Sequence, residues 1–226
     1  LCEIRGIRWI RILYCYPEEI YDELIETIRD EKKICHYLDI PIQHASDRIL
    51  KRMGRRTSKQ ELIDIVGKLR KEIPDIVLRT TLITGFPGET EEDHEELKEF
   101  VDEMEFDRLG VFTYSPEENT PAAEMADQVP EEVKEERRDE LMELQQEISY
   151  DRGQDRIGQE LLVMIEGKVA DESAYIGRTY GDAPKVDGYI FVQTGELLMT
   201  GDFAKVRVTG ALEYDLIGVL SDEYTE

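Results

Sequence analysis

The feature that most constrains the fold is an alternation of apolar runs and helical stripes over residues 7–113. Each cycle is roughly 30–40 residues long, the size of a strand–helix–strand unit, which implies parallel strands joined by right-handed crossovers. Because four strands do not close a barrel, we expect an α/β partial (TIM-like) barrel of parallel strands with outer helices. The expected strands are Ile7–Tyr14, Leu38–Ile42, Ile76–Thr84 and Arg108–Thr113.

Local signals predict where the helices between these strands begin. Pro17 suits the first position of a helix, and Ser46 can cap a helix whose inward face would be Ile49, Leu50 and Met53. A second group of signals marks two more helices: Ser58 and Glu61 have the spacing of a capping box, Pro74 stops the helix that follows, and Thr90 starts the next one.

After Gly153 the pattern changes from helical spacing to short strands between turn residues. A long charged helix, Asp127–Tyr150, precedes the change. We place the domain boundary near Arg152–Arg156, with domains at 1–153 and 154–226. Five short strands predict a small all-β, OB-like closed barrel. These strands are Glu160–Glu166, Ala174–Tyr180, Gly188–Val192, Phe203–Val208 and Leu212–Val219.

The charge balance restricts the partners. The chain carries 52 acidic and 28 basic residues, a formal net charge of −24. Residues 157–226 contain 13 acids and five bases, a net charge of −8. This excess disfavours a phosphate backbone as a direct partner and favours a basic protein. No run approaches the ~20 apolar residues of a membrane span, so we expect a cytoplasmic protein without a membrane partner.

The cysteines predict no metal site. Cys2, Cys15 and Cys35 are separated by 13 and 20 residues, a spacing that fits no cluster or zinc motif. We expect buried free thiols in a reducing cytosol.

Polar residues follow all four expected strands, at the end where parallel strand–helix proteins do their chemistry. They predict a shared ligand-facing rim, although polar loops would produce part of this pattern. None is assigned as a catalytic acid or base. They are Tyr14 and Tyr16, Gln43 and His44, Thr84 and Gly85, and Tyr114 and Ser115.

Two further features leave alternatives open. The segment Gly85-Phe-Pro-Gly88 lacks the spacing of a Rossmann or P-loop motif, so it is either a tight turn or a place where backbone approaches a ligand. Arg79 lies inside an apolar strand, where a lone charge is costly. It either pairs with an acid or points into the pocket to hold a carboxylate.

The remaining basic residues favour structural explanations. His44 is expected to be a hydrogen-bonded structural histidine, and His36 and His94 to lie in surface segments. An uninterrupted basic run is interpreted as a solvated face, with an acid-binding patch as the alternative. This run is Arg48, Lys51, Arg52, Arg55, Arg56 and Lys59.

Several stretches resemble the radical S-adenosylmethionine (SAM) methylthiotransferases, and the resemblance covers essentially the whole chain. The sequence is most similar to the RimO type, which modifies an aspartate of a small-subunit ribosomal protein. The tRNA-modifying MiaB type usually differs where this chain has Gln43-His44-Ala45-Ser46. The tail from about Ile157 is similar to a TRAM domain. The stretches are Ile7–Pro17, Tyr37–Arg55, Leu78–Thr90 and Phe112–Ala122, with Ala174–Val192 and Glu213–Leu220 in the tail.

The resemblance implies SAM as cofactor and two 4Fe–4S clusters in the full-length protein. The family motif C-x3-C-x2-C is absent here, so the cluster ligands are expected to lie outside this chain. We therefore expect the last four barrel strands plus TRAM, inactive by itself. The cofactor-binding residues implied by the resemblance are Gln43, Arg79, Ile83, Gly85 and Tyr114.

The function predicted from this resemblance is methylthiolation of a basic small-subunit ribosomal protein that docks on the acidic TRAM domain. Two alternatives remain at this point. One is a tRNA (adenosine) methylthiotransferase of the MiaB type, because TRAM domains often bind RNA. The other is a non-catalytic module that binds the ribosomal protein.

Overall fold

The computed structural model describes residues 1–221. The chain divides into two compact units, Leu1–Gln145 and the part from Gln146 onward. The division falls inside a helix that both units share, and each unit is described below by itself.

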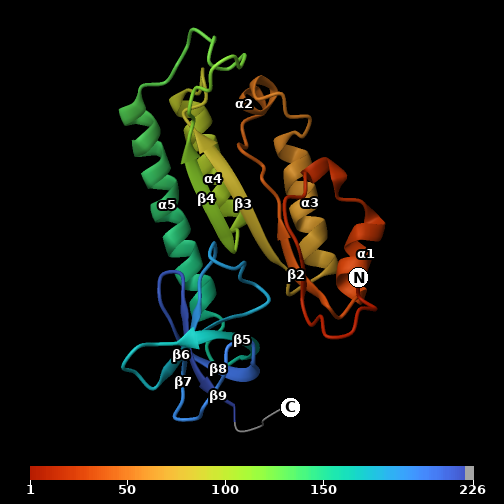
Figure 1. Ribbon diagram of the computed structural model, residues 1–226. Helices are drawn as coiled ribbons and strands as arrows, with labels where there is room; N and C mark the ends of the chain where they lie inside the picture. Colours follow the sequence, from red (N-terminus) through yellow and green to blue (C-terminus); the bar gives the residue numbers. More distant parts are fainter. Residues whose placement is uncertain (222–226) are drawn as a thin grey trace. The chain divides into compact units, whose positions relative to one another are not determined.

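The first unit is a four-stranded sheet with helices between its strands (Figure 1). The strand order is β1-β2-β3-β4, and every neighbouring pair is parallel, which confirms the predicted α/β partial barrel. Its elements are β1 (Ile10–Ile12), η1 (Pro17–Glu19), α1 (Asp22–Asp30), β2 (Ile34–Asp39), α2 (Asp47–Arg52), α3 (Lys59–Glu72), β3 (Val77–Thr84), α4 (Glu91–Met104), β4 (Arg108–Thr113) and α5 (Glu131–Gln154).

The two faces of this sheet are buried to different degrees. On one face of β3, Leu78, Thr80, Leu82 and Thr84 are buried. On the other face, Thr81 and Ile83 are only half-buried. The helices pack on the buried face, and the other face is left partly open. A ligand can therefore reach the sheet from its open face and from the ends of its strands.

β2 is shifted from its predicted place. It spans Ile34–Asp39, whereas the sequence predicted Leu38–Ile42. Pro41 has no N–H to donate to a ladder, so continuous pairing ends before it. Pairing with β3 resumes in a single bridge between Gln43 and Leu82.

The helix starts follow the capping signals with three differences. Ser58 and Thr90 both form capping boxes, with Glu61 and Asp93. Ser46 precedes α2 as predicted, but its side chain makes no capping hydrogen bond and donates instead to Asp93 (2.6 Å). The single helix expected from Pro17 is instead a short 3-10 turn followed by α1, because the backbone is extended at Ile20. Helix α5 begins at Glu131 rather than near Asp127. Val129 precedes Pro130, and the residue before a proline is disfavoured in a helical conformation.

The second unit is a closed barrel with strand order β5-β6-β7-β9-β8. It confirms the predicted five-stranded OB-like barrel, with strand ends moved by up to four residues. Its strands are β5 (Glu160–Lys168), β6 (Ala174–Arg178), β7 (Ile190–Gln193), β8 (Phe203–Ala211) and β9 (Leu216–Leu220). The core of the barrel is apolar and consists of Val163, Ile165, Tyr175, Ile190, Val192, Val206, Val208 and Leu216.

No helix among residues 1–221 is both long and apolar enough to cross a membrane.

Candidate functional site

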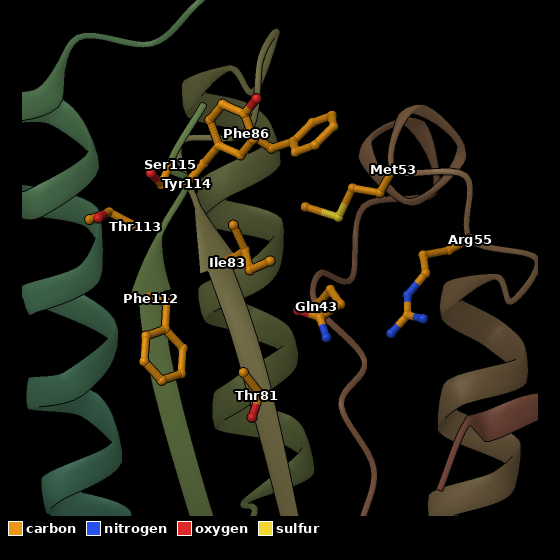
Figure 2. A pocket seen from close by; sticks show the side chains of 10 residues that line it. All are labelled: Gln43, Met53, Arg55, Thr81, Ile83, Phe86, Phe112, Thr113, Tyr114 and Ser115. Carbon is orange, nitrogen blue, oxygen red and sulfur yellow. The ribbon is translucent and has the colours of Figure 1, made fainter. Parts of the chain in front are cut away.

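A pocket of about 510 Å³ lies where the carboxyl ends of β3 and β4 meet the segment after β2 (Figure 2). Small-molecule sites in proteins usually have volumes of ~300–1,000 Å³. Apolar side chains form most of its wall, and a few polar groups face the same space. Its lining residues are Gln43, Met53, Arg55, Thr81, Ile83, Phe86, Phe112, Thr113, Tyr114 and Ser115.

Gln43 reaches the pocket through an unusual backbone conformation. Its φ is +72°, in the left-handed region that residues with a side chain rarely adopt. Two hydrogen bonds to β3 hold it there: the Gln43 N–H donates to the Thr81 carbonyl (2.9 Å), and the Gln43 carbonyl accepts from the Ile83 N–H (2.8 Å). Strained backbone of this kind is often found at ligand sites, where the surrounding contacts fix it.

The turn after β3 is held from behind by a buried carboxylate. Oε2 of Glu89 accepts hydrogen bonds from the N–H groups of Gly85 (2.6 Å) and Phe86 (3.2 Å). This fixes the backbone from which Phe86 contacts Tyr114 edge-to-face, with ring centroids 5.2 Å apart. Glu89 therefore shapes one wall of the pocket without lining it.

Gly85 is required by packing inside the unit. Its φ is +71°, and a Cβ at this position would collide with the side-chain stem of Lys134. The Lys134 side chain extends past the turn, and its ammonium donates a hydrogen bond to the Tyr114 carbonyl (2.9 Å). The close approach at Gly85 thus belongs to a lysine of α5, which favours the tight-turn interpretation of this segment.

Glu89 belongs to a buried polar network. Its side chain is 0% exposed and that of Arg137 is 8% exposed, and Arg137 Nη1 donates to Glu89 Oε1 at 3.1 Å. Nε2 of His44, also fully buried, lies 3.7 Å from Glu89 Oε2 and has no hydrogen-bond partner within residues 1–221. Nδ1 of His44 accepts from the Ser46 N–H (2.9 Å), so the structural role expected for His44 is supported at this atom.

Arg79 does not itself line the pocket, although it contacts the lining residue Thr81. It precedes Thr81 by two residues on β3 and lies on the same face of the strand. Its Nη1 pairs with Asp39 at 3.0 Å and donates to Thr81 Oγ1 at 3.2 Å. This geometry favours pairing with an acid over holding a ligand carboxylate, and the predicted cofactor contact stays a prediction.

The structure brings together three of the five predicted cofactor residues. Gln43, Ile83 and Tyr114 line one pocket, whereas Arg79 and Gly85 are not part of its lining. Ser115 joins the same lining from the predicted rim. Tyr14 and Tyr16 are 78% and 53% exposed and lie outside it, although the Tyr16 ring is 5.1 Å from the Arg55 guanidinium that lines the pocket.

The basic run is a solvated face only in part, because Arg48, Lys51 and Arg56 are exposed. Arg48 pairs with Asp93, Arg52 with Asp127 and Lys59 with Glu96, so three of the six charges pair with acids of the same unit. The sequence could not reveal this, because the acids lie 37–75 residues away.

Other surface and burial expectations need correction. His94 was expected at the surface, but it is 1% exposed and its Nε2 contacts Glu140 at 3.1 Å. Cys35 is buried as expected, whereas Cys2 and Cys15 are only half-buried. No group of three His, Cys, Asp or Glu residues within 1–221 could hold a metal ion.

Sequence reasoning missed several lining residues. Thr81 could have been found from the period of two along β3, since it shares a face with Ile83. Phe86 and Phe112 carry no such signal, because an aromatic residue in a turn or strand is more often part of a core. The roles of Glu89 and Arg137 depend on contacts between segments 48 residues apart.

The pocket suits a small organic ligand better than a metal cluster. Its wall is mostly apolar, and the buried hydroxyl of Tyr114 has no hydrogen-bond partner within the described residues. Such an atom can accept or donate a bond to a ligand. The residues present therefore fit an organic cofactor and do not fit an iron–sulfur cluster.

Two family models match the chain, one in each unit. Residues 1–101 match the model of the radical SAM superfamily, and residues 157–220 match that of the TRAM domain. Coproporphyrinogen III oxidase (HemN) from Escherichia coli, described as a radical SAM enzyme, superposes with a TM-score of 0.53 at 18% identity. This match covers 77% of this chain and 45% of that one, and it supports the fold alone.

Curated relatives are much more similar in sequence. The ribosomal protein uS12 methylthiotransferase RimO of Lachnoclostridium phytofermentans is 66% identical over 218 residues, which is 96% of this chain and 50% of the relative. The protein of the same name from Clostridium botulinum (strain Langeland) is 53% identical over 226 residues, 100% of this chain and 50% of the relative. The chain thus spans about half the length of the curated relatives it matches.

Proposed function

Residues 1–101 belong to the radical SAM superfamily and residues 157–220 form a TRAM domain, and from this premise we propose that the chain is part of a ribosomal protein uS12 methylthiotransferase. The observation that carries the proposal is the 66% identity to a relative of that name over nearly the whole chain. The reaction proposed is addition of a methylthio group to an aspartate of this ribosomal protein.

The pocket at the ends of β3 and β4 is proposed to hold SAM. Gln43 would offer polar groups to the cofactor, and Ile83 with the Tyr114 ring would provide an apolar surface beside it. When bound, SAM supplies the radical and methyl chemistry of the reaction. The chain's own residues bind and orient the cofactor: Glu89 fixes the turn that carries Phe86, and Lys134 fixes the Tyr114 carbonyl.

The radical SAM superfamily also uses 4Fe–4S clusters. No residues within 1–221 form a ligand group for a metal, so the residues described here do not fit such a cluster.

The barrel unit is proposed to dock the ribosomal protein. Residues 157–226 carry 13 acids and five bases, and this charge attracts a basic protein and repels a nucleic-acid backbone. We place the border between the cofactor-binding and docking domains at residues 153–154. Modification of a ribosomal protein would take place in the cytoplasm.

The test of the proposed function is deletion of the encoding gene in the source organism. We expect the intact mass of uS12 to lose the methylthio group, and the wild-type gene on a plasmid to restore it. An unchanged uS12 mass together with loss of a methylthio group from tRNA nucleosides would reject the proposal in favour of the tRNA alternative.

A second test addresses the pocket directly. Calorimetric titration of the chain with SAM should show weaker binding for Gln43→Ala. Arg79→Ala separates the two interpretations of that residue: weaker SAM binding supports the predicted carboxylate contact, whereas unchanged affinity with lower thermal stability supports the ion pair with Asp39. Glu103→Ala, at an exposed position of α4, is a control that should change neither.

A further inference from the structure

The barrel displays two large apolar side chains on the loop between β7 and β8. Leu197 is 91% exposed and Met199 is 73% exposed, the two most exposed large apolar residues of the barrel. Leu198 between them points the other way and packs against the barrel core. We call residues 197–199 the apolar tip.

The apolar tip is held by defined contacts at both ends. The buried Tyr175 hydroxyl donates to the Glu196 carbonyl (3.2 Å) and accepts from the Leu198 N–H (3.2 Å). The Asp202 carboxylate accepts from the Met199 N–H at 2.7 Å. The loop therefore presents Leu197 and Met199 in a fixed position, so little conformational entropy is lost when a partner covers them.

Acidic residues lie in the loop of the apolar tip and in the turn next to it. The neighbouring β5–β6 turn is tied to the same loop by a hydrogen bond from the Thr194 N–H to the Ser173 carbonyl (3.0 Å). The turn contributes Asp171 and Glu172, and the β7–β8 loop contributes Glu196 and Asp202. Neither loop contains a base, and the bases next to them in the chain are Lys168 in β5 and Lys205 in β8.

We propose that the apolar tip and the acids of its loop and the neighbouring turn are the surface on which the barrel docks the basic ribosomal protein. The inference rests on the proposed function and names the surface that carries it out. The partner segment would place an apolar side chain against Leu197 and Met199 while its Lys and Arg residues face the acids. An apolar centre with a charged rim is the usual arrangement of a protein interface.

The charges argue against other occupants. A nucleic acid or an anionic membrane would bring more negative charge to the acids and gain no phosphate contact from Leu or Met. A second copy of this chain would oppose two acidic surfaces. A basic polypeptide satisfies both the apolar and the charged parts of the surface.

The experiment measures binding of purified uS12 to this chain by calorimetry at low salt. We expect Leu197→Ser/Met199→Ser to weaken binding at least about tenfold, because both side chains would lie at the centre of the interface. The matched control is Val186→Ser, which changes an apolar residue of the same barrel that is 61% exposed in another turn. Its affinity should change less than about twofold.

The acids are tested by Asp171→Asn/Glu172→Gln. This variant should bind more weakly at low salt and lose less affinity than wild type when salt is added, because the Debye length falls from about 10 Å at 0.1 M to about 3 Å at 1 M. Circular dichroism and melting curves check that each variant is folded. All substituted side chains are exposed, so folding should be unaffected.

The outcomes separate the two levels of the proposal. If wild type binds uS12 and the Leu197/Met199 variant binds equally well, the apolar tip is not the docking surface and the proposed function stands. If wild type does not bind uS12, docking by the barrel is rejected and the inference falls with it. Binding of tRNA, vesicles or a second copy that the same variant abolishes, without an effect on uS12, would also overturn the inference.

Discussion

The two units of this protein differ in what they bury. Behind its pocket, the α/β unit buries a polar network in which Glu89, Arg137 and His44 are all at most 8% exposed at their side chains. The core of the barrel is a single apolar cluster, and the polar residues that the barrel buries, Thr179, Asp182 and Ser221, lie outside its strands. Its polar and charged residues lie mainly in turns and loops, such as those around the apolar tip.

The proposed function assigns a different kind of binding surface to each unit, and this difference in buried groups fits that assignment. A pocket made of strand ends and turns needs its backbone fixed from behind, and buried hydrogen bonds are directional enough to do so. A docking surface on a small barrel needs only a stable support, which an apolar core provides. The comparison predicts that substitutions in the two cores will have different consequences for binding.

The largest effect is expected from Glu89→Ala. It leaves Arg137 buried without its main partner and frees the Gly85 and Phe86 N–H groups, which should destabilise the α/β unit by about 4 kcal/mol. Hydrogen exchange should rise around residues 85–89, and SAM binding should weaken. Denaturation with urea, followed by mass spectrometry of exchange in both units, provides the measurement.

The control for this prediction is Glu91→Ala. Glu91 pairs with the same arginine at 3.1 Å, but its side chain is 69% exposed. Its loss should change stability by less than about 0.5 kcal/mol. Equal effects of the two substitutions would show that burial of the network is unimportant.

The apolar core is tested by Ile190→Ala. Ile190 is 0% exposed in the barrel, and truncation should cost about 3 kcal/mol by lost burial and cavity formation. SAM binding to the α/β unit should be unchanged. Val219→Ala, on the adjoining strand and 36% exposed, should cost under about 1 kcal/mol. Weaker SAM binding by a folded Ile190→Ala protein would contradict the separation of roles.

A smaller, pH-dependent effect is expected at Asp93, whose side chain is 7% exposed. Burial acts to raise the pKa of Asp93, but hydrogen bonds from Arg48, Ser46 and Thr90 outweigh it and hold the pKa well below its usual value. A lowered folded-state pKa contributes stability above the unfolded pKa, near 4 for Asp. This contribution is lost as the pH falls through the folded-state pKa.

Asp93→Asn should therefore cost about 1–2 kcal/mol at neutral pH and flatten the loss of stability in acid. Melting temperatures between neutral pH and pH 2 check both parts. Glu61→Gln is the matched variant in the exposed capping box of α3, where the Ser58 backbone N–H is the main cause of a lowered Glu61 pKa. Glu61→Gln should change the loss of stability at low pH less than Asp93→Asn does.

The smallest stability effect is expected at Gln43. Gln43→Gly should stay within about 0.5 kcal/mol of wild type, because relief of the left-handed backbone offsets the greater freedom of the unfolded chain. Gln43→Ala keeps the strain and should be less stable than Gln43→Gly. Both should bind SAM more weakly, and wild-type affinity in both variants would remove Gln43 from the site.

The sequence by itself determined the order of elements and their types. Period and capping signals are local, so the capping box at Ser58, the helix start at Thr90, strand β4 and the change to a barrel after Gly153 could all be predicted. Gln43 and Tyr114 were expected at one rim because parallel strands put their carboxyl ends at one edge, whereas Ile83 was expected there only from the family resemblance.

Only the tertiary structure decided which charges are buried and with whom. No local signal marks Glu89, Arg137 and His94 as buried, because their partners lie 46–48 residues away in sequence. The shift of β2 and the ion pair of Arg79 likewise depend on the register with neighbouring strands. Apolar faces leave a periodic pattern in a sequence and helix caps leave a local one. Hydrogen bonds and ion pairs between distant segments leave neither.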